Sequence, residues 1–341
     1  MKKRILAMIL TAAMSLSMVG CGGNNKQTQN ATPTAEGGNN PYVLKMNLAK
    51  GPNSPYYAIW DQFCKEVEDR SEGTLKMELY ASEALGNTVD MVEAAAKGAA
   101  VLQDCDPSHL ADYVPDFSVF MHPYLFSKPE DIETLWKSEL GGNMMEELEA
   151  QGLHVVTMVY FGTRHLISDK KIETRDDTKG MKLRCAPTKM WNEVINVLGG
   201  EATNTAWSEV YTALSQGVAD GAESPVGILY DSKLQECVKH LSLTGHLIAT
   251  SSIVMSEDVY QSLPDAAKKA IDEVGSEWPA INMDLVKDIE AEYTEKMLAE
   301  GVEVNEITDR DSFVEASKSV SNAFPEWTPG LYDSVMEVIA S

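Results

Sequence analysis

Two arginines are the residues best placed to do chemistry in this sequence. Arg184 lies at the end of the apolar run Met181–Pro187, and Arg164 directly follows Phe161–Thr163. An arginine at the end of a buried strand is partly desolvated, which is costly unless an anion meets it. A guanidinium facing a carboxylate forms two parallel charge-assisted hydrogen bonds. Each arginine therefore predicts either a carboxylate ligand or an internal salt bridge, and its position alone leaves both open.

An aromatic and an acidic residue are further binding candidates. Trp207 precedes Ser208–Tyr211 at the start of a predicted helix, and its alternative role is packing in the core. Asp104 and Asp106 flank Cys105 at the end of a short apolar run. These acids are a weak metal signal, and we expect them instead to cap a turn or to line a cleft.

The sequence carries no recognisable catalytic constellation. It has no Gly-x-Ser-x-Gly elbow, no His-Glu-x-x-His motif and no phosphate-binding glycine loop. Its six histidines are scattered, and no pair has metal-ligand spacing with a third ligand nearby. We therefore expect no metal, no cofactor and no enzymatic activity.

Composition narrows the classes of partner. The chain of 341 residues has a formal net charge of −24, so phosphate backbones would repel it and nucleic acid is not an expected partner. Acidity does not decide the ligand, because a cleft can be locally basic. Four cysteines follow Cys21 without a zinc or redox spacing, and we expect them to be small buried hydrophobes: Cys64, Cys105, Cys185 and Cys237.

The N-terminus predicts export and anchoring. Lys2, Lys3 and Arg4 precede an uncharged, mostly apolar stretch, which is typical of a secretory signal over residues 1–20. Cys21 follows Gly20 as in a bacterial lipobox, where the thiol is acylated. Residues 21–40 are polar and lack apolar periodicity, so they predict a flexible tether. An ordinary signal with an incidental cysteine is the alternative.

The rest of the chain alternates between strand and helix patterns. Strands are expected where apolar residues alternate or run together, at 44–48, 75–79, 100–102, 155–159 and 181–185, with another after Val218–Gly221. Helices are expected at 59–72, 89–97, 191–198 and 210–214. This order is typical of two α/β units, and two such units facing each other form a cleft at their strand ends. Pro264–Gly301 predicts one long helix or two in tandem spanning both units, and Phe313–Ile339 predicts further helix.

Several ordered segments resemble the solute-binding proteins of tripartite ATP-independent periplasmic (TRAP) transporters, the group that binds dicarboxylates and sialic acid. The resemblance runs from about Tyr42 to the C-terminal helices. The segments that carry it are Tyr113–Phe117, Pro123–Phe126, Phe161–Arg164, Lys179–Arg184, Trp207–Leu214, Gly217–Pro225 and Leu241–His246.

The resemblance assigns roles to individual residues. It implies that Arg184 forms the main salt bridge to a ligand carboxylate and that Arg164 is a second arginine of the cleft. It implies that Trp207 covers the ligand, and Tyr211, one helical turn further on, is expected on the same wall. Asp106 aligns loosely with a cleft position that could accept a hydroxyl or amine hydrogen bond.

One position departs from the family pattern. The chain has Ser224 in Ala222–Pro225, where the family often has Gln-Glu-Asn-Pro with an asparagine that helps to hold the ligand. Serine is shorter and lacks the amide, so this second contact is expected to be lost, relocated or bridged by water.

The resemblance implies an α/β, two-lobed periplasmic-binding-protein fold with a ligand cleft between the lobes and long C-terminal helices spanning both. Lobe I is expected over 42–161 plus about 250–289, and lobe II over 162–249 plus about 290–341. The implied function is capture of a small organic acid by hinge closure and its delivery to TRAP membrane subunits, with the lipid on Cys21 holding the protein at the membrane. The alternatives are a ligand-sensing lipoprotein for a membrane kinase, a binding protein of an ABC importer and, least favoured, an extracellular enzyme.

Overall fold

The structure, a computed structural model, describes residues 40–340 and begins with the expected β-α-β-α-β segment. Ile59, Phe63 and Val67 form the buried face of the first helix, with polar residues opposite. Leu44 and Met46 point into the core from the first strand. The elements are β1 (Tyr42–Asn47), α1 (Pro55–Arg70), β2 (Leu75–Tyr80), α2 (Thr88–Ala96) and β3 (Val101–Cys105).

The described strands form one mixed sheet. Its order is β2-β1-β3-β8-β4-β7-β5-β6, with β9 paired to β8. Strands β1 to β3 are mutually parallel, as are β5 to β7, and each group joins the antiparallel pair of β4 and β8. The two expected α/β units are therefore present as two ends of a shared sheet. The remaining strands are β4 (Leu153–Ser168), β5 (Lys182–Cys185), β6 (Glu201–Asn204), β7 (Gly221–Pro225), β8 (His240–Ser256) and β9 (Glu303–Glu306).

We call the end with β1 to β3 the first half and the end with β5 to β7 the second half. Strands β4 and β8 run through both, and their pairing shifts register three times along the way. One shift lies between Tyr160 and Gly162, where Gly162 has a φ of 121°. A Cβ at this position would lie 2.7 Å from the Cβ of Pro225, so glycine permits both the bend and the close approach of β7.

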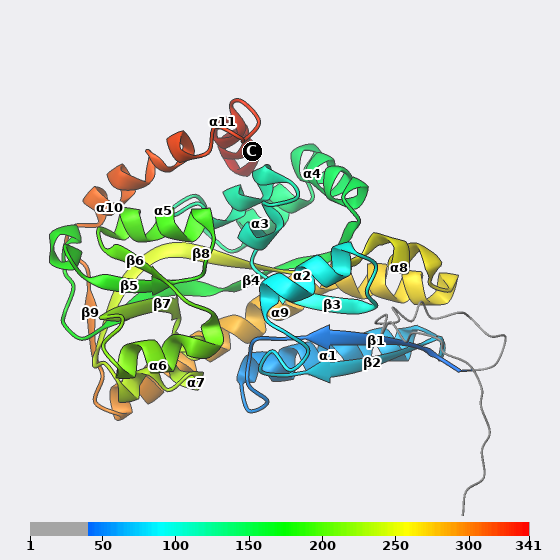
Figure 1. Ribbon diagram of the computed structural model, residues 1–341, viewed down its shortest axis with the longest axis horizontal. Helices are drawn as coiled ribbons and strands as arrows, with labels where there is room; N and C mark the ends of the chain where they lie inside the picture. The colour runs from blue at the N-terminus through cyan, green and yellow to red at the C-terminus, as the bar shows by residue number, and fades with distance from the viewer. Residues whose placement is uncertain (1–39, 341) are drawn as a thin grey trace, which may run out of the picture. The chain divides into compact units, whose positions relative to one another are not determined.

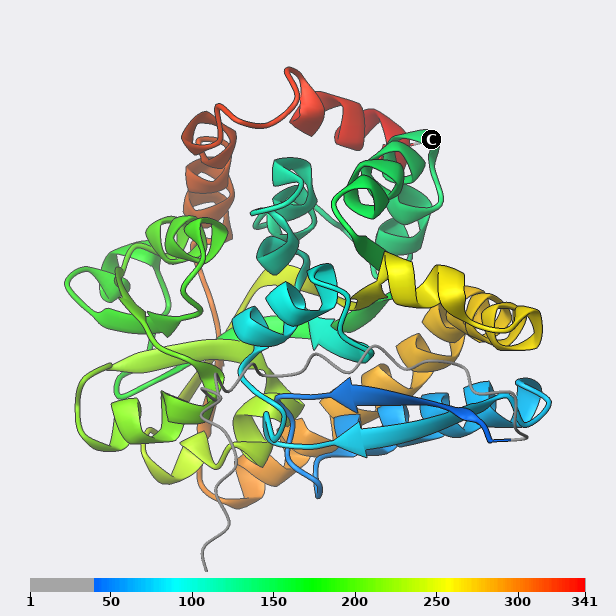
Figure 2. The ribbon, with the colours of Figure 1, turned by 45° about the vertical axis from the view of Figure 1, so that its right-hand side comes forward.

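A single long helix, α9 (Asp265–Ala299), spans the molecule. It packs on β4 and contacts α1 of the first half and α7 (Val226–Asp231) of the second (Figures 1 and 2). Two of its side chains hold the bend of β4. Asn282 Nδ2 donates to the carbonyl oxygen of Tyr160 at 2.6 Å, and Glu290 accepts from the Tyr160 hydroxyl at 2.6 Å and from the Thr163 N–H at 2.5 Å.

The closing segment crosses from one half to the other (Figure 2). The predicted helix at its start is α10 (Arg310–Ser317), which packs on α5 (Lys189–Leu198), and the last helix, α11 (Leu331–Ala340), packs on α3 (Glu130–Trp136). The two lobe boundaries stay predictions. The other described α-helices are α4 (Glu139–Ala150), α6 (Val210–Ser215) and α8 (Glu257–Ser262).

The signal at 1–20, Cys21 and the tether, apart from Asn40, lie outside the described residues. Within 40–340, no helix has both the length and the apolar character needed to span a bilayer. The four cysteines of this part are free. Cys64, Cys105 and Cys185 are buried, as expected, whereas Cys237 is half-buried.

Candidate ligand-binding cleft

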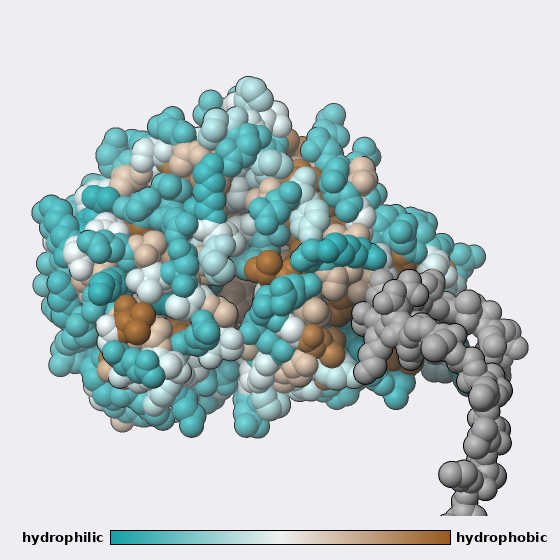
Figure 3. Space-filling model, in the orientation of Figure 1, coloured by the Kyte–Doolittle hydropathy of each residue, from teal (hydrophilic) through white to brown (hydrophobic). Residues whose placement is uncertain are grey.

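A cavity of about 410 Å³ lies where the two halves meet, and Figure 3 shows the hollowed surface above it. Its size suits a small molecule. Residues at the ends of β1 and β3 and in the middle of β8 line one side, namely Lys50, Asp104, Asp106, His109 and Thr250. Residues of the second half line the other, namely Arg164, Arg184, Trp191, Trp207, Glu223 and Ser224.

Arg184 is a buried cation without a carboxylate partner among the described residues. Its side chain projects from the end of β5 and the residue is only 3% exposed. Its Nη2 donates to the Thr205 carbonyl oxygen at 2.6 Å, and its guanidinium lies 4.9 Å from the centre of the Trp207 ring. Burial lowers the pKa of Arg184 to about 10, which still leaves it protonated at neutral pH. The site therefore presents a desolvated positive charge to the cavity.

Arg164 lines the same cavity but already has a partner. Its Nη2 donates to Oε1 of Glu223 at 2.8 Å and to the Glu223 carbonyl oxygen at 3.1 Å, and its Nε binds the second carboxylate oxygen. Burial alone would raise the pKa of Glu223, but the Arg164 charge and a contact with His246 Nε2 at 3.3 Å hold it below its usual range. Of the two roles that the sequence position of Arg164 allowed, the structure therefore shows the internal salt bridge.

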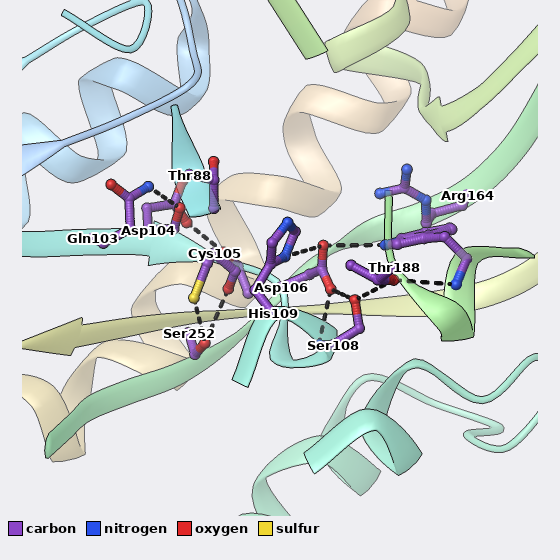
Figure 4. Close-up of polar contacts among 12 residues, drawn as sticks. Thr88, Gln103, Asp104, Cys105, Asp106, Ser108, His109, Arg164, Thr188 and Ser252 are labelled. Carbon is purple, nitrogen blue, oxygen red and sulfur yellow. Dashed lines mark hydrogen bonds and ion pairs between the residues drawn. The ribbon is translucent and has the colours of Figure 1, made fainter. Parts of the chain in front are cut away.

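Asp106 forms the centre of a polar cluster that joins the two halves (Figure 4). Its carboxylate accepts from the Ser108 N–H at 2.9 Å and from Trp191 Nε1 at 3.2 Å, and it lies 3.1 Å from His109 Nδ1. Burial opposes ionisation of Asp106, but the charge of His109 and these hydrogen bonds hold its pKa well below the usual range. The same carboxylate outweighs the effect of burial on His109 and raises the pKa of that imidazole. Ser108 also meets Thr188 of the second half at 3.1 Å.

A second ion pair lies in the wall of the first half. The Lys50 ammonium binds the Asp104 carboxylate, whose other oxygen accepts from the Ser251 hydroxyl. The side chains of Lys50 and Asp104 are 11% and 0% exposed, and the ammonium lies 4.4 Å from the centre of the Phe161 ring. Beside Ser251, the buried Thr250 hydroxyl has no hydrogen-bond partner among residues 40–340.

The other predicted residues are divided between two places. Trp207 and Ser224 line the cavity, and Trp207 is held by a 3.1 Å hydrogen bond from its Nε1 to Ser232. Tyr211 does not line it. It lies on a neighbouring cavity, is 40% exposed and donates its hydroxyl to Glu236 at 3.0 Å.

Sequence reasoning missed several polar residues of the wall, among them Lys50, Glu223 and Thr250. Lys50 begins the Pro-rich segment 50–55, whose composition indicates a turn and gives no signal of a cavity. Glu223 directly precedes Ser224, and this position beside a predicted ligand contact is the sequence signal that could have found it. Thr250 gave no signal, because nothing in the sequence marked the middle of β8 as a cavity wall.

One group of possible metal ligands lies away from the cavity. His154 Nδ1 is 3.0 Å from Glu257 and 3.6 Å from Glu149, and the imidazole stacks on Tyr260 with 3.7 Å between ring centres. The distances are those of an ion-pair network, and we assign no metal to it.

Comparison with known proteins agrees with this architecture. The model of the family "bacterial extracellular solute-binding protein, family 7" matches residues 46–326. A TRAP periplasmic solute-binding protein from Ochrobacterium anthropi, solved with bound L-fuconate, is 33% identical with a TM-score of 0.84, covering 88% of this chain and 99% of that one.

Two further relatives have different ligands in their names. A TRAP periplasmic solute-binding protein from Actinobacillus succinogenes, solved with bound L-galactonate, is 30% identical with a TM-score of 0.84, covering 88% of this chain and 99% of that one. The C4-dicarboxylate-binding periplasmic protein of Rhodobacter capsulatus is 28% identical over 76% of this chain and 77% of its own length. With most of its length matched by the family model and its fold shared with solved members, this chain belongs to family 7 of the bacterial extracellular solute-binding proteins, the solute-binding proteins of TRAP transporters.

Proposed function

We propose that this protein captures a small organic acid in the cleft, binds the ligand carboxylate with Arg184 and delivers the acid to TRAP membrane subunits. The observation that carries the proposal is the buried Arg184 guanidinium, which has no carboxylate partner among the described residues. A buried charge left unpaired is costly. A ligand carboxylate would neutralise this charge and accept two charge-assisted hydrogen bonds from the guanidinium.

Capture follows hinge closure between the two lobes predicted from the sequence, 42–161 with about 250–289 and 162–249 with about 290–341. Only contacts made better in the closed form can drive closure. Arg184, Ser224 and Trp207 hold the ligand from the second half, and Asp106 binds it from the first. Arg164 contributes through Nη1, since its Nε and Nη2 are occupied by Glu223.

We also propose that Cys21 is acylated and that residues 21–40 tether the folded body to the outer side of the cell membrane. The support is the charged and apolar segment before Cys21 and the family's extracellular location. Radiolabelled palmitate should enter the native protein and not a Cys21→Ser variant. Equal labelling of both would contradict the anchor.

Isothermal titration calorimetry on the purified chain tests the ligand assignment. L-Fuconate, L-galactonate and C4-dicarboxylates form the first panel, because relatives are named for them. Arg184→Ala should weaken the ligand by about 2–5 kcal/mol, since it removes one partner of a buried charge pair. Arg184→Lys should recover only part of this loss, because lysine lacks the planar fork.

The matched control is Arg70→Ala. Arg70 pairs with Glu66 and Glu277 on the surface, outside the cavity wall, so its removal should leave the affinity unchanged. A folded Arg184→Ala protein that still binds the ligand with native affinity would refute the assignment.

A further inference from the structure

The cationic groups in the cavity wall are paired with acids, with one exception among the described residues. Lys50 binds Asp104, Arg164 binds Glu223, and His109 lies against Asp106. Arg184 alone among these cationic groups has no acidic partner in the described part of the chain; its contacts are with Thr205 and the Trp207 ring. The wall therefore leaves one positive charge for a ligand to neutralise.

Acidic side chains outnumber basic ones around the cavity. Besides the three paired acids, Glu83 and Asp90 lie at its rim, where they accept hydrogen bonds from Thr88 and Asn87. A second negative charge on the ligand would find no free cation and would approach these carboxylates. In a desolvated cleft, juxtaposing like charges is costly.

The wall is also rich in hydrogen-bond acceptors. Ionised carboxylates accept hydrogen bonds and donate none, so Asp104, Asp106 and Glu223 favour a ligand with several O–H groups. The Thr250 hydroxyl is buried and has no partner in the described part of the chain, and it lies in the wall next to Ser251, which donates to Asp104. An unpartnered buried hydroxyl is costly, and a ligand hydroxyl at this point would supply its partner.

We propose that the cleft selects a monocarboxylate that bears several hydroxyl groups, that Lys50, Asp104 and Thr250 form the subsite for the hydroxylated end, and that dicarboxylates are excluded. This inference rests on the proposed function, because it takes Arg184 as the site of the carboxylate. It adds how many negative charges the ligand carries and which residues contact the end of the ligand opposite its carboxylate.

Two acids with one carbon skeleton test the charge rule. Galactonate ends in a hydroxymethyl group where galactarate has a second carboxylate, and the two are otherwise identical. Calorimetry on the full chain should show galactonate binding at least about 30-fold more tightly, because the second carboxylate meets acids and no free cation. Succinate should bind no better than galactarate.

Asp104→Asn supplies the reverse test. The change keeps the shape and a hydrogen-bond acceptor while it frees the charge of Lys50, so the preference for galactonate over galactarate should shrink at least about tenfold. Asp61→Asn is the control, since Asp61 pairs with Lys65 on the surface of α1 and should leave the ratio unchanged. An unchanged ratio in folded Asp104→Asn protein would overturn the subsite.

Thr250→Val separates a binding role from a structural one. Valine has the same shape and removes the unpartnered hydroxyl, so the melting temperature should stay the same or rise. Galactonate should nevertheless bind about 3- to 10-fold more weakly, the size expected for one lost hydrogen bond. Unchanged affinity for galactonate would show that Thr250 does not contact the ligand.

The two proposals fail in different ways. If galactarate or succinate binds as tightly as galactonate, and Arg184→Ala abolishes that binding, the charge rule is wrong while the carboxylate site stands. If no carboxylate in the panel binds, or binding survives in Arg184→Ala, the proposed function itself is wrong.

Discussion

Buried polar side chains with unfilled hydrogen-bonding capacity occur both in the cleft and in the core of this protein. In the cleft, Arg184 and Thr250 are left with bonding capacity that the described residues do not fill. Elsewhere the same kind of group has a purely structural consequence. His122 is only 1% exposed. Its Nδ1 lies 2.9 Å from the Pro123 carbonyl oxygen, and its Nε2 has no partner among the residues that the structure describes. Protonation of that imidazole would place a positive charge in the core, where no described residue accepts a hydrogen bond from the Nε2–H.

His122 should therefore contribute to acid unfolding. Burial lowers its pKa to about 4, whereas an unfolded histidine has a pKa near about 6.5, so the unfolded chain takes up this proton first. The contribution of His122 to stability is full above pH of about 6.5 and is lost as the pH falls toward 4, by up to about 3 kcal/mol. Denaturant unfolding from pH 7 to pH 4 should show a shallower decline in a His122→Gln variant, whose amide can still donate to Pro123.

The free energies of unfolding of the variant and the native protein are compared at each pH. A loss of stability that is the same at every pH therefore does not affect the comparison. Parallel stability curves for the two proteins would show that His122 does not carry this proton uptake.

At the scale of elements, α9 and β4 form the seam that joins the two halves. In its first third the helix passes so close to the strand that a Cβ at Gly275 would lie 2.3 Å from the Val156 carbonyl oxygen. The approach is fixed by a hydrogen bond of 2.7 Å from the Thr157 hydroxyl to the Gly275 carbonyl oxygen. Further along, Glu290 binds the backbone at the bend of β4. The helix thus positions the strand that carries Arg164.

Gly275→Ala should force the helix away from β4 and lower the free energy of unfolding by about 1–3 kcal/mol, the usual cost of overpacking. The control is Gly142→Ala in α4, where an added Cβ meets nothing within 4 Å. Alanine is the better helix former, so this variant should gain about 0.5–1 kcal/mol. Urea unfolding of both variants checks the contrast, and equal effects would mean that the close approach at Gly275 is not a constraint.

At the scale of the whole molecule, the sequence predicts local secondary structure better than it predicts contacts between distant segments. The sequence predicts the β-α-β-α-β opening, and it predicts one helix or two in tandem over the segment of α9, because apolar periodicity, prolines and glycines act on near neighbours. The antiparallel pairing of β4 with β8 was not predicted, because register between distant segments leaves no local pattern. The cavity residues follow the same rule. Arg184 could be found at the end of its strand, whereas the pairing of Lys50 with Asp104 depends on how β1 and β3 are placed side by side.

The pairing of β3 with the end of β8 has a consequence for how the protein is made. Cys105 and its contact Ser252 are 147 residues apart in the chain, and α9, which packs on α1, comes later still. An emerging N-terminal segment therefore lacks both the strand that closes its sheet and the helix that covers its core. Such non-local contacts form slowly. The first half can therefore complete its sheet and its core only after the chain has been synthesised as far as α9.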